Sequence, residues 1–448
     1  MKQPHIAFLP IARTTFDIEL AKKVTDLARF QLSQLPVTIG GPIELITDLQ
    51  SAQEIASSLA SDPPDLLLIF QATFADSSMI MSLAEAIDAP IMLWAIPEDH
   101  TGGRLRLNSL CGINLAGHAL TRAGYRYGHV FAAPDDPVVL DEVIKWAKAG
   151  YARNLLRQSR LGRVGENPDG FETCLLDAAR IKKVFGLEVL QFDLTKEFFP
   201  LARKIEPGRI DAIQEQLNEK VTGLDELEST ATRGTLRVYA ALQQLSQQRK
   251  LGGFAVRCWP EFFTEMGCAA CGAMSMLSDE LIPCSCEADV NGTITQMILQ
   301  AISGEPAFGT DIVSLDNERD ALVIWHCGLA PLSMADPQKP RGVTIHSNRK
   351  LPLLFEFTLK PGPVTIARLT ESSGEYRLVI GSGEIVRGPK SFSGTSGLLH
   401  FERPARDILD MILSEGLEHH ISITYGNYVD VIIAFAQILN IPILQFSD

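Results

Sequence analysis

The sequence predicts two α/β domains with parallel sheets, followed by a β-rich C-terminal domain. Up to about residue 305, short apolar runs alternate with amphipathic stretches of helical period, which is typical of parallel sheets covered by helices. Beyond Asp311, short strand-like runs separated by turns such as Pro361-Gly362 and Ser373-Gly374 indicate a small barrel or sandwich. The chain has 448 residues, more than one core usually supports. We therefore predict domains at residues 1–155, 156–305 and 306–448.

In the first domain, apolar runs predict strands at residues 5–11, 37–39, 66–70 and 91–96, with helical stretches between them. Ligands of parallel sheets bind at the carboxyl ends of the strands. Arg13 follows the first of these strands, and Trp94 lies near the end of the fourth, just before Glu98 and Asp99. No glycine-rich nucleotide-binding motif and no P-loop motif occurs, so we do not expect a nucleotide-binding domain.

The second domain begins after an arginine-rich helical stretch at residues 144–161. Its predicted strands lie at residues 189–192, 254–258 and 281–286, and its predicted helices at 210–221, 230–248, 266–277 and 294–302. The C-terminal domain has seven strand-like runs from residue 311 to 401, a helix at 404–415, a strand at 419–424, a helix at 428–439 and a last strand at 443–446.

Composition limits the class of protein. Hydrophobic residues make up 46% of the chain and charged residues 21%, as in soluble globular proteins. The net charge of −14 argues against nucleic acid and anionic membranes as partners. No run reaches the roughly 18 apolar residues of a membrane span, and the short apolar stretch at residues 6–12 is interpreted as a strand rather than a signal peptide. We therefore expect a cytoplasmic protein whose eight cysteines are thiols.

Carboxylates gather between residues 284 and 311. Glu287 ends a strand-like run, Asp289 follows it, Asn291-Gly292 is predicted to form a turn, and Asp311 opens the next extended run. Acidic side chains at element ends can converge on a cleft, where they suit a hard divalent cation or proton transfer. A helix cap is an equally good explanation from this segment alone, because acids are stabilised at helix N-termini.

A pair of histidines could complete a metal site with these carboxylates. His419 and His420 precede a strand, and because adjacent strand residues face opposite ways, we expect one of them to face a given site. Glu287, Asp311 and one of these histidines would suit Mn²⁺ or Mg²⁺ better than tetrahedral zinc.

The cysteines offer a competing metal site. Cys268, Cys271, Cys284 and Cys286 have spacings that resemble a four-cysteine zinc site. The alanines and methionines around them favour packed structure instead, in which cysteine behaves as a small apolar residue.

A set of motifs in order resembles one family. The motifs are R-T-T-F-D (residues 13–17), L-W-A-I-P-E (93–98), C-W-P-E-F (258–262), P-C-S-C-E-A-D-V-N-G (283–292), F-G-T-D (308–311), H-C-G (326–328) and H-H-x-x-x-x-Y-G (419–426). Together they look like the L-fucose/L-arabinose isomerase superfamily, and closest to its shorter L-fucose isomerase-like proteins. The resemblance covers essentially the whole chain.

The resemblance implies two flavodoxin-like α/β domains, a C-terminal β-rich domain, and interconversion of an aldose and a ketose with Mn²⁺, for which Mg²⁺ or Co²⁺ can substitute. It implies that Glu287 and Asp311 bind the metal and serve in proton transfer, and that His420 is the third ligand. The expected mechanism passes through a cis-enediolate, and which carboxylate removes the proton from C2 stays open.

The resemblance also implies the surroundings of the site. Trp259, Cys327 and His419 would contact the sugar, while Arg13 and Trp94 would reach a neighbouring subunit's site in a homo-oligomer (a trimer or hexamer). From composition alone, a pairing of Arg13 with Asp17 and a core position for Trp94 are favoured. Cys327 and His419 depart from the long fucose isomerases, so the sugar stays open. The alternative functions are a sugar-binding or regulatory protein without turnover, and an epimerase or aldolase that uses the same enediolate.

Overall fold

The computed structural model describes residues 3–447, which fall into two compact units. The first unit runs to Leu155 and includes Asp430–Ile441. The second unit contains Leu156–Val429 and the chain from Pro442 on. The second parallel sheet and the C-terminal barrel both belong to this second unit, and the predicted boundary between them at residue 305 stays a prediction.

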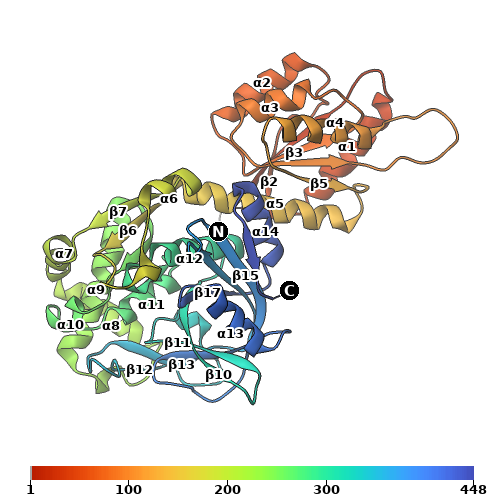
Figure 1. Ribbon diagram of the computed structural model, residues 1–448. Helices are drawn as coiled ribbons and strands as arrows, with labels where there is room; N and C mark the ends of the chain where they lie inside the picture. The colour runs from red at the N-terminus through yellow and green to blue at the C-terminus, as the bar shows by residue number, and fades with distance from the viewer. Residues whose placement is uncertain (1–2, 448) are drawn as a thin grey trace. The chain divides into compact units, whose positions relative to one another are not determined.

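The first unit is built on a five-stranded parallel sheet in the order β2-β1-β3-β4-β5, which is the flavodoxin-like order. Figure 1 draws this unit in red to yellow, with helices packed around the sheet. Its strands are β1 (His5–Ile11), β2 (Thr38–Gly40), β3 (Leu66–Gln71), β4 (Ile91–Ala95) and β5 (Tyr127–Phe131). Its helices are α1 (Ile18–Leu32), α2 (Leu49–Ala60), α3 (Ser78–Ala86), α4 (Ser109–Arg122), α5 (Pro137–Gln158) and α14 (Val429–Leu439).

Strand alternation divides the core of this unit into two faces. Ala7, Leu9 and Ile69 pack in one cluster with apolar residues of α2, α3 and α4. Phe8 and Phe70 point to the opposite face, where the guanidinium of Arg29 in α1 lies 5.0 Å from the ring centroid of Phe8. The sheet is therefore covered by helices on both sides, as the apolar strands predicted.

The second unit contains a four-stranded parallel sheet in the order β7-β6-β8-β9. Its strands are β6 (Arg160–Val164), β7 (Glu188–Phe192), β8 (Leu251–Val256) and the very short β9 (Cys284–Ser285). Its α-helices are α6 (Ala178–Phe185), α7 (Phe199–Arg203), α8 (Pro207–Asn218), α9 (Ser229–Arg249), α10 (Glu261–Thr264), α11 (Cys271–Asp279) and α12 (Val290–Ser303). The parallel sheets predicted from the sequence are thus confirmed.

Helix α12 is buried along nearly its whole length. The carboxylate of Asp289 caps its N-terminus by accepting a hydrogen bond from the backbone N–H of Gly292, at 2.8 Å, and Gly304 ends it in the left-handed conformation. The predicted turn at Asn291-Gly292 is wrong, because with Asp289 as the cap these two residues form the first helical turn. The predicted stop at Gly304 is confirmed.

A closed barrel forms the rest of the second unit, in the strand order β16-β11-β10-β17-β14-β15 with β15 pairing back to β16. The strands of the barrel and its edges are β10 (Phe308–Asp316), β11 (Ala321–His326), β12 (Gly342–Thr344), β13 (Leu354–Thr358), β14 (Gly362–Thr370), β15 (Arg377–Val386), β16 (Thr395–His400), β17 (His420–Tyr425) and β18 (Ile443–Gln445), with helix α13 (Ala405–Ser414). The β-rich C-terminal domain is therefore confirmed, with the barrel rather than the sandwich.

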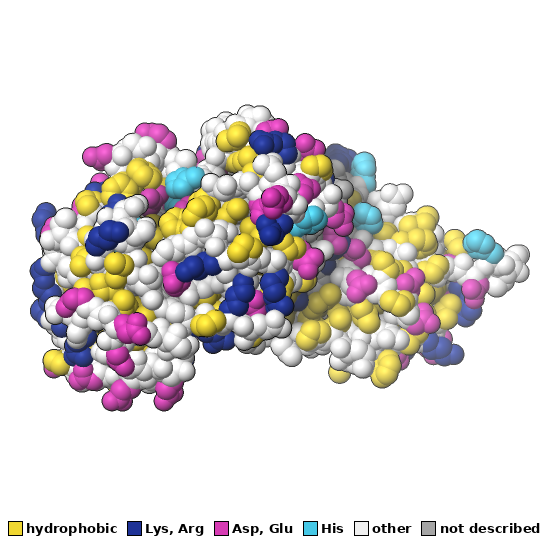
Figure 2. Space-filling view, turned by 90° about the horizontal axis from the view of Figure 1, so that it is seen from below, with side chains coloured by type: hydrophobic (Ala, Val, Ile, Leu, Met, Phe, Trp, Pro, Cys, Tyr) yellow, Lys and Arg dark blue, Asp and Glu magenta, His cyan; other side chains and the backbone are white. Residues whose placement is uncertain are grey.

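Acidic and basic side chains are interspersed on the face drawn in Figure 2. Across the residues that the structure describes, no helix is both long and apolar enough to cross a membrane.

Candidate active site

A cavity of about 340 Å³ lies in the second unit, between the carboxyl edge of its parallel sheet and the barrel. Trp259 follows β8 and Glu287 follows β9, and both line the cavity from the sheet side. Asp311 on β10, His326 on β11 and His420 on β17 line it from the barrel side. The carboxyl edge of a parallel sheet is the usual ligand-binding edge, and here the barrel supplies the opposite wall.

Barrel pairing brings Asp311 and His420 together. The two residues are direct cross-strand partners on β10 and β17, so their side chains share one face of the sheet. The Nε2 atom of His420 lies 3.4 Å from Oδ1 of Asp311 and 3.9 Å from Oε2 of Glu287. Residues that are far apart in the sequence therefore converge around one imidazole nitrogen.

The backbone at Glu287 is strained. Glu287 and Ala288 both adopt positive φ angles, 58° and 56°, which cost about 1–3 kcal/mol each in non-glycine residues. This reversal of the chain directs the Glu287 carboxylate into the cavity. Its Oε1 accepts a hydrogen bond from the indole N–H of Trp259 at 3.1 Å, and its Oε2 lies 3.2 Å from Nε2 of His419. Strain of this kind persists at functional sites because surrounding contacts hold it in place.

Burial alone would raise the pKa of Glu287. The hydrogen bonds with His419 and from Trp259 oppose that effect, and the pKa of Glu287 is lowered. The hydrogen bond to Glu287 in turn raises the pKa of His419. The Glu287 carboxylate is therefore ionised at neutral pH.

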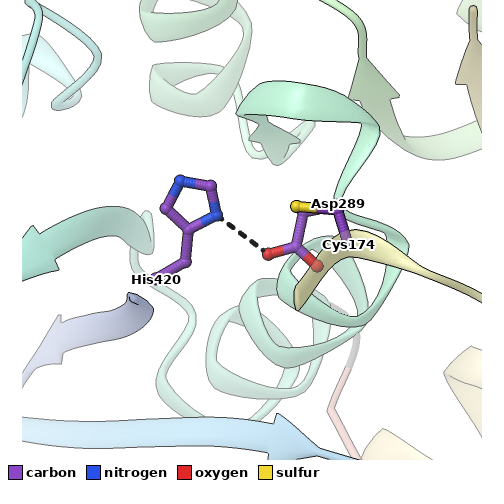
Figure 3. Close-up of side chains that lie close together, drawn as sticks. All are labelled: Cys174, Asp289 and His420. Carbon is purple, nitrogen blue, oxygen red and sulfur yellow. Dashed lines mark hydrogen bonds and ion pairs between the residues drawn. The ribbon is translucent and has the colours of Figure 1, made fainter. Parts of the chain in front are cut away.

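A buried ion pair lies behind His420. Arg368 on β14 donates to both carboxylate oxygens of Asp289, at 2.6 and 3.2 Å, and both side chains are 1% exposed. Figure 3 shows the ring of His420 turned toward this carboxylate, with 3.1 Å between its Nδ1 and Oδ2 of Asp289. Burial would raise the pKa of Asp289, but the charge of Arg368 and the hydrogen bond with His420 hold it far below its usual value. An ionised Asp289 accepts the Nδ1 proton, which leaves Nε2 of His420 as the lone-pair nitrogen that faces the cavity.

The loop after β6 completes this side of the cavity. The ring of Phe171 packs edge-on against Trp259, with 5.5 Å between centroids. The hydroxyl of Thr173 lies 3.2 Å from Nδ1 of His419. Cys174 lies close to Asp289 and His420, and burial raises the pKa of its thiol to about 12. A protonated thiol beside a carboxylate that is already paired is a poor cation site.

The acidic and imidazole side chains that line the cavity fit a hard divalent cation. Besides the group with Cys174 and Asp289, two groups of potential ligands in the described chain share His420: Glu287 with His419, and Asp311 with His326. The predicted trio of Glu287, Asp311 and His420 is divided between these two groups. The Oδ1 atom of Asp311 is buried without a hydrogen-bond partner, which is the state expected of a ligand oxygen. Carboxylate oxygens around one imidazole suit Mn²⁺ or Mg²⁺.

The four-cysteine zinc site receives no support. None of the ligand groups found in residues 3–447 contains more than one cysteine. The sulfurs instead approach in pairs, Cys258 with Cys286 at 2.6 Å and Cys271 with Cys327 at 3.3 Å, and both pairs line the cavity. Cys327, which the resemblance places beside the sugar, is thus at the cavity wall.

The two residues proposed from the first unit have local partners there. Arg13 pairs with Asp76 at 3.0 Å, not with Asp17, which pairs with Arg106. The side chain of Trp94 is fully buried against Phe70, and its indole N–H donates to a backbone carbonyl. This is the core position that composition favoured, so its ring has no face free for a sugar. A shared site between subunits stays a prediction.

Strand alternation does not separate the two histidines as expected. Both rings face Glu287, with 4.0 Å between their centroids. Strand β17 begins at His420, so His419 lies just before the strand and does not follow its pleat.

Several residues of the site had no role predicted from the sequence. Asp289 was noted as an acidic residue. Arg368 lies within an apolar run, which indicates a buried charge, but nothing in the sequence indicates that Asp289 is its partner. The loop with Phe171 and Thr173 follows the first strand of its sheet, so its place at the ligand-binding edge could have been inferred. His346 and Arg349 also line the cavity, and no pattern in the sequence indicates this.

Comparisons with known proteins identify a family. A family described as "Fucose/sulfoquinovose isomerase, N-terminal domain" matches residues 8–147, and "L-fucose isomerase, C-terminal domain" matches residues 355–447. Similar proteins include the sulfoquinovose isomerase of Alkalicoccus urumqiensis, 30% identical over 443 residues and 99% of each chain. Those of Priestia aryabhattai and Clostridium sp. (strain MSTE9) are each 29% identical over 98% of this chain and 99% of their own.

The Asp289–Arg368 pair makes a prediction about stability. Asp289→Asn keeps the helix cap but leaves the buried guanidinium of Arg368 with Glu418, 3.6 Å from its Nε, as its one acidic partner among the described residues. We therefore expect the free energy of unfolding at pH 7 to fall by up to about 3–5 kcal/mol. Because the folded-state pKa of Asp289 is lowered, the stabilisation is complete above its usual pKa of about 4 and is lost as the pH falls below it. The difference between wild type and variant should therefore shrink below about pH 4, as measured by urea unfolding at several pH values.

Asp177→Asn is the matched control. Asp177 caps α6 through the backbone N–H of Arg180 at 3.0 Å and is exposed. Asparagine caps equally well, so this substitution should change the stability by less than about 0.5 kcal/mol. An equal loss in the two variants would contradict a special role for the buried pair.

Proposed function

Because the chain belongs to the fucose/sulfoquinovose isomerase family and is an aldose–ketose isomerase, we propose that it isomerises a sulfonated aldose in this cavity. The proposed cofactor is a divalent cation, with Mn²⁺ preferred. The relatives named above are sulfoquinovose isomerases, and sulfoquinovose is a hexose that carries a sulfonate on its last carbon. The proposed reaction moves a proton between C1 and C2 through a cis-enediolate.

One observation carries the proposal. Two carboxylates from opposite walls, Glu287 and Asp311, meet at the one imidazole nitrogen of His420 that the Asp289 contact leaves free. Carboxylates alone could bind sugar hydroxyls, but two of them that converge on an imidazole lone pair suit a cation and proton transfer. Glu287, Asp311 and His420 would hold the cation, which when bound supplies polarisation of the sugar carbonyl.

The chain's own residues support proton transfer. The Glu287 carboxylate is ionised, and Trp259 and His419 fix both of its oxygens, so it is oriented to accept a proton. One of Glu287 and Asp311 would take the proton from C2 and deliver it to C1, while the other handles the hydroxyl proton. The rings of Phe171 and Trp259 form an apolar part of the cavity wall. Exclusion of water by a bound sugar would raise the basicity of a carboxylate there.

Metal removal and the two carboxylates test the proposal together. Chelation should abolish isomerisation of sulfoquinovose, and Mn²⁺ should restore it better than Zn²⁺. Glu287→Gln and Asp311→Asn should each lower kcat by at least about 100-fold without loss of fold, measured by ketose formation and circular dichroism. Asp316→Asn, on the same strand but paired with Arg319, should keep wild-type kcat. Full activity in metal-free protein would refute the proposal.

The histidines separate metal binding from sugar binding. Because Nε2 of His420 faces both carboxylates, His420→Ala should weaken Mn²⁺ affinity on the order of 10- to 100-fold, with partial rescue by excess Mn²⁺. His419→Ala should keep the metal and, if His419 contacts the sugar, mainly raise KM. Metal content and titration calorimetry of the two purified variants would show this, and the reverse order would mean that His419 is the ligand.

A further inference from the structure

One basic side chain stands out in the cavity. Among the described residues that line it, Arg349 is the only arginine or lysine, whereas Glu287 and Asp311 supply negative charge. The chain as a whole carries a net charge of −14, so an anionic substrate meets an unfavourable field unless a local cation receives it. Arg349 lies in the loop after β12, on the barrel side of the cavity.

Two aromatic rings hold the guanidinium of Arg349. Its Cζ lies 4.9 Å from the ring centroid of Trp259 and 5.2 Å from that of Phe263. Stacking of this kind restricts the side chain without using its N–H donors. Trp259 also donates its indole N–H to Glu287, so a single indole separates the cation from the carboxylate. Glu287 and Arg349 thus both contact this indole, and both line the cavity.

The donors of Arg349 are left for a ligand. Within the part of the chain that the structure describes, its side chain contacts an imidazole and no carboxylate: NH1 lies 3.2 Å from Nε2 of His346. The Nδ1 atom of His346 already faces the backbone N–H groups of Asn348 and Arg349, at 3.3 Å each. A neutral imidazole accepts at one nitrogen only, so His346 does not satisfy the guanidinium.

We propose that Arg349 is the subsite for the anionic group of the substrate, a sulfonate on the carbon farthest from the reacting end of the sugar. The planar fork of a guanidinium matches two oxygens of such a group. This inference rests on the proposed function, and it adds the residue that selects the sulfonated sugar. A phosphate ester offers the same oxyanion chemistry, so the test includes one.

The test compares substrates that differ in this group alone. Wild-type enzyme and Arg349→Gln, both loaded with Mn²⁺, are assayed with sulfoquinovose, with glucose 6-phosphate and with neutral 6-deoxyglucose. We expect Arg349→Gln to raise KM for sulfoquinovose on the order of 10- to 100-fold with little change in kcat, and to leave the weaker reaction of the neutral sugar unchanged. Arg349→Lys, which keeps the charge but loses the fork, should lie between the two. Lys350→Gln, the adjacent exposed cation that does not line the cavity, is the control and should behave as wild type.

The outcomes separate this inference from the proposed function. If wild type isomerises sulfoquinovose and Arg349→Gln does so with the same KM, the subsite is wrong while the proposed function stands. If wild type prefers the neutral sugar, the subsite is also wrong. A preference for glucose 6-phosphate that is lost in Arg349→Gln keeps the subsite and assigns it to a phosphorylated sugar. Titration calorimetry with sulfoquinovose covers the case without turnover: binding that is lost in Arg349→Gln supports the subsite, and equal binding or no binding by wild type refutes it.

Discussion

The candidate site depends on a buried ion pair, Asp289 with Arg368, that joins three parts of the second unit. Asp289 follows the strand end that carries Glu287, caps α12 and bonds to His420, while Arg368 comes from β14 and His420 from β17. A second acid, Glu418, lies 3.6 Å from Nε of Arg368. Burying such charges costs desolvation energy, so the pair is weak evidence for stability by itself. The pair matters for the site because its carboxylate fixes which nitrogen of His420 faces the cavity.

The strained turn at Glu287 depends on the same arrangement. Two successive residues with positive φ would be unfavourable in an isolated chain, but here the next residue, Asp289, is held by a helix N-terminus and a guanidinium. The strain and the ion pair together place one carboxylate in the cavity and another behind it. Two acids two residues apart thus have different tasks, one toward the ligand and one toward the scaffold.

Much of the fold followed from the sequence, because strand period and helical period are local properties. The parallel sheets, the stop of α12 at Gly304 and the β-rich C-terminal domain were predicted on this basis. The start of α12 was missed, because a cap at Asp289 and a turn at Asn291-Gly292 have similar sequence signals. Contacts between distant segments, such as Asp289 with Arg368 or Arg349 with Trp259, depend on tertiary packing and have no local signal. The barrel register that pairs Asp311 with His420 is of the same kind.

The central claim is that Glu287, Asp311 and His420 hold the cation of an aldose–ketose isomerase. A crystal structure of the Mn²⁺-loaded protein, with anomalous diffraction measured at the manganese absorption edge, tests it most directly. The account predicts one strong anomalous peak in contact with a carboxylate oxygen of Glu287, the buried Oδ1 of Asp311 and Nε2 of His420, with the Asp289 contact at Nδ1 retained. A peak at the cysteine sulfurs, or at Asp289 and Cys174 with Glu287 and Asp311 outside the coordination sphere, would contradict it.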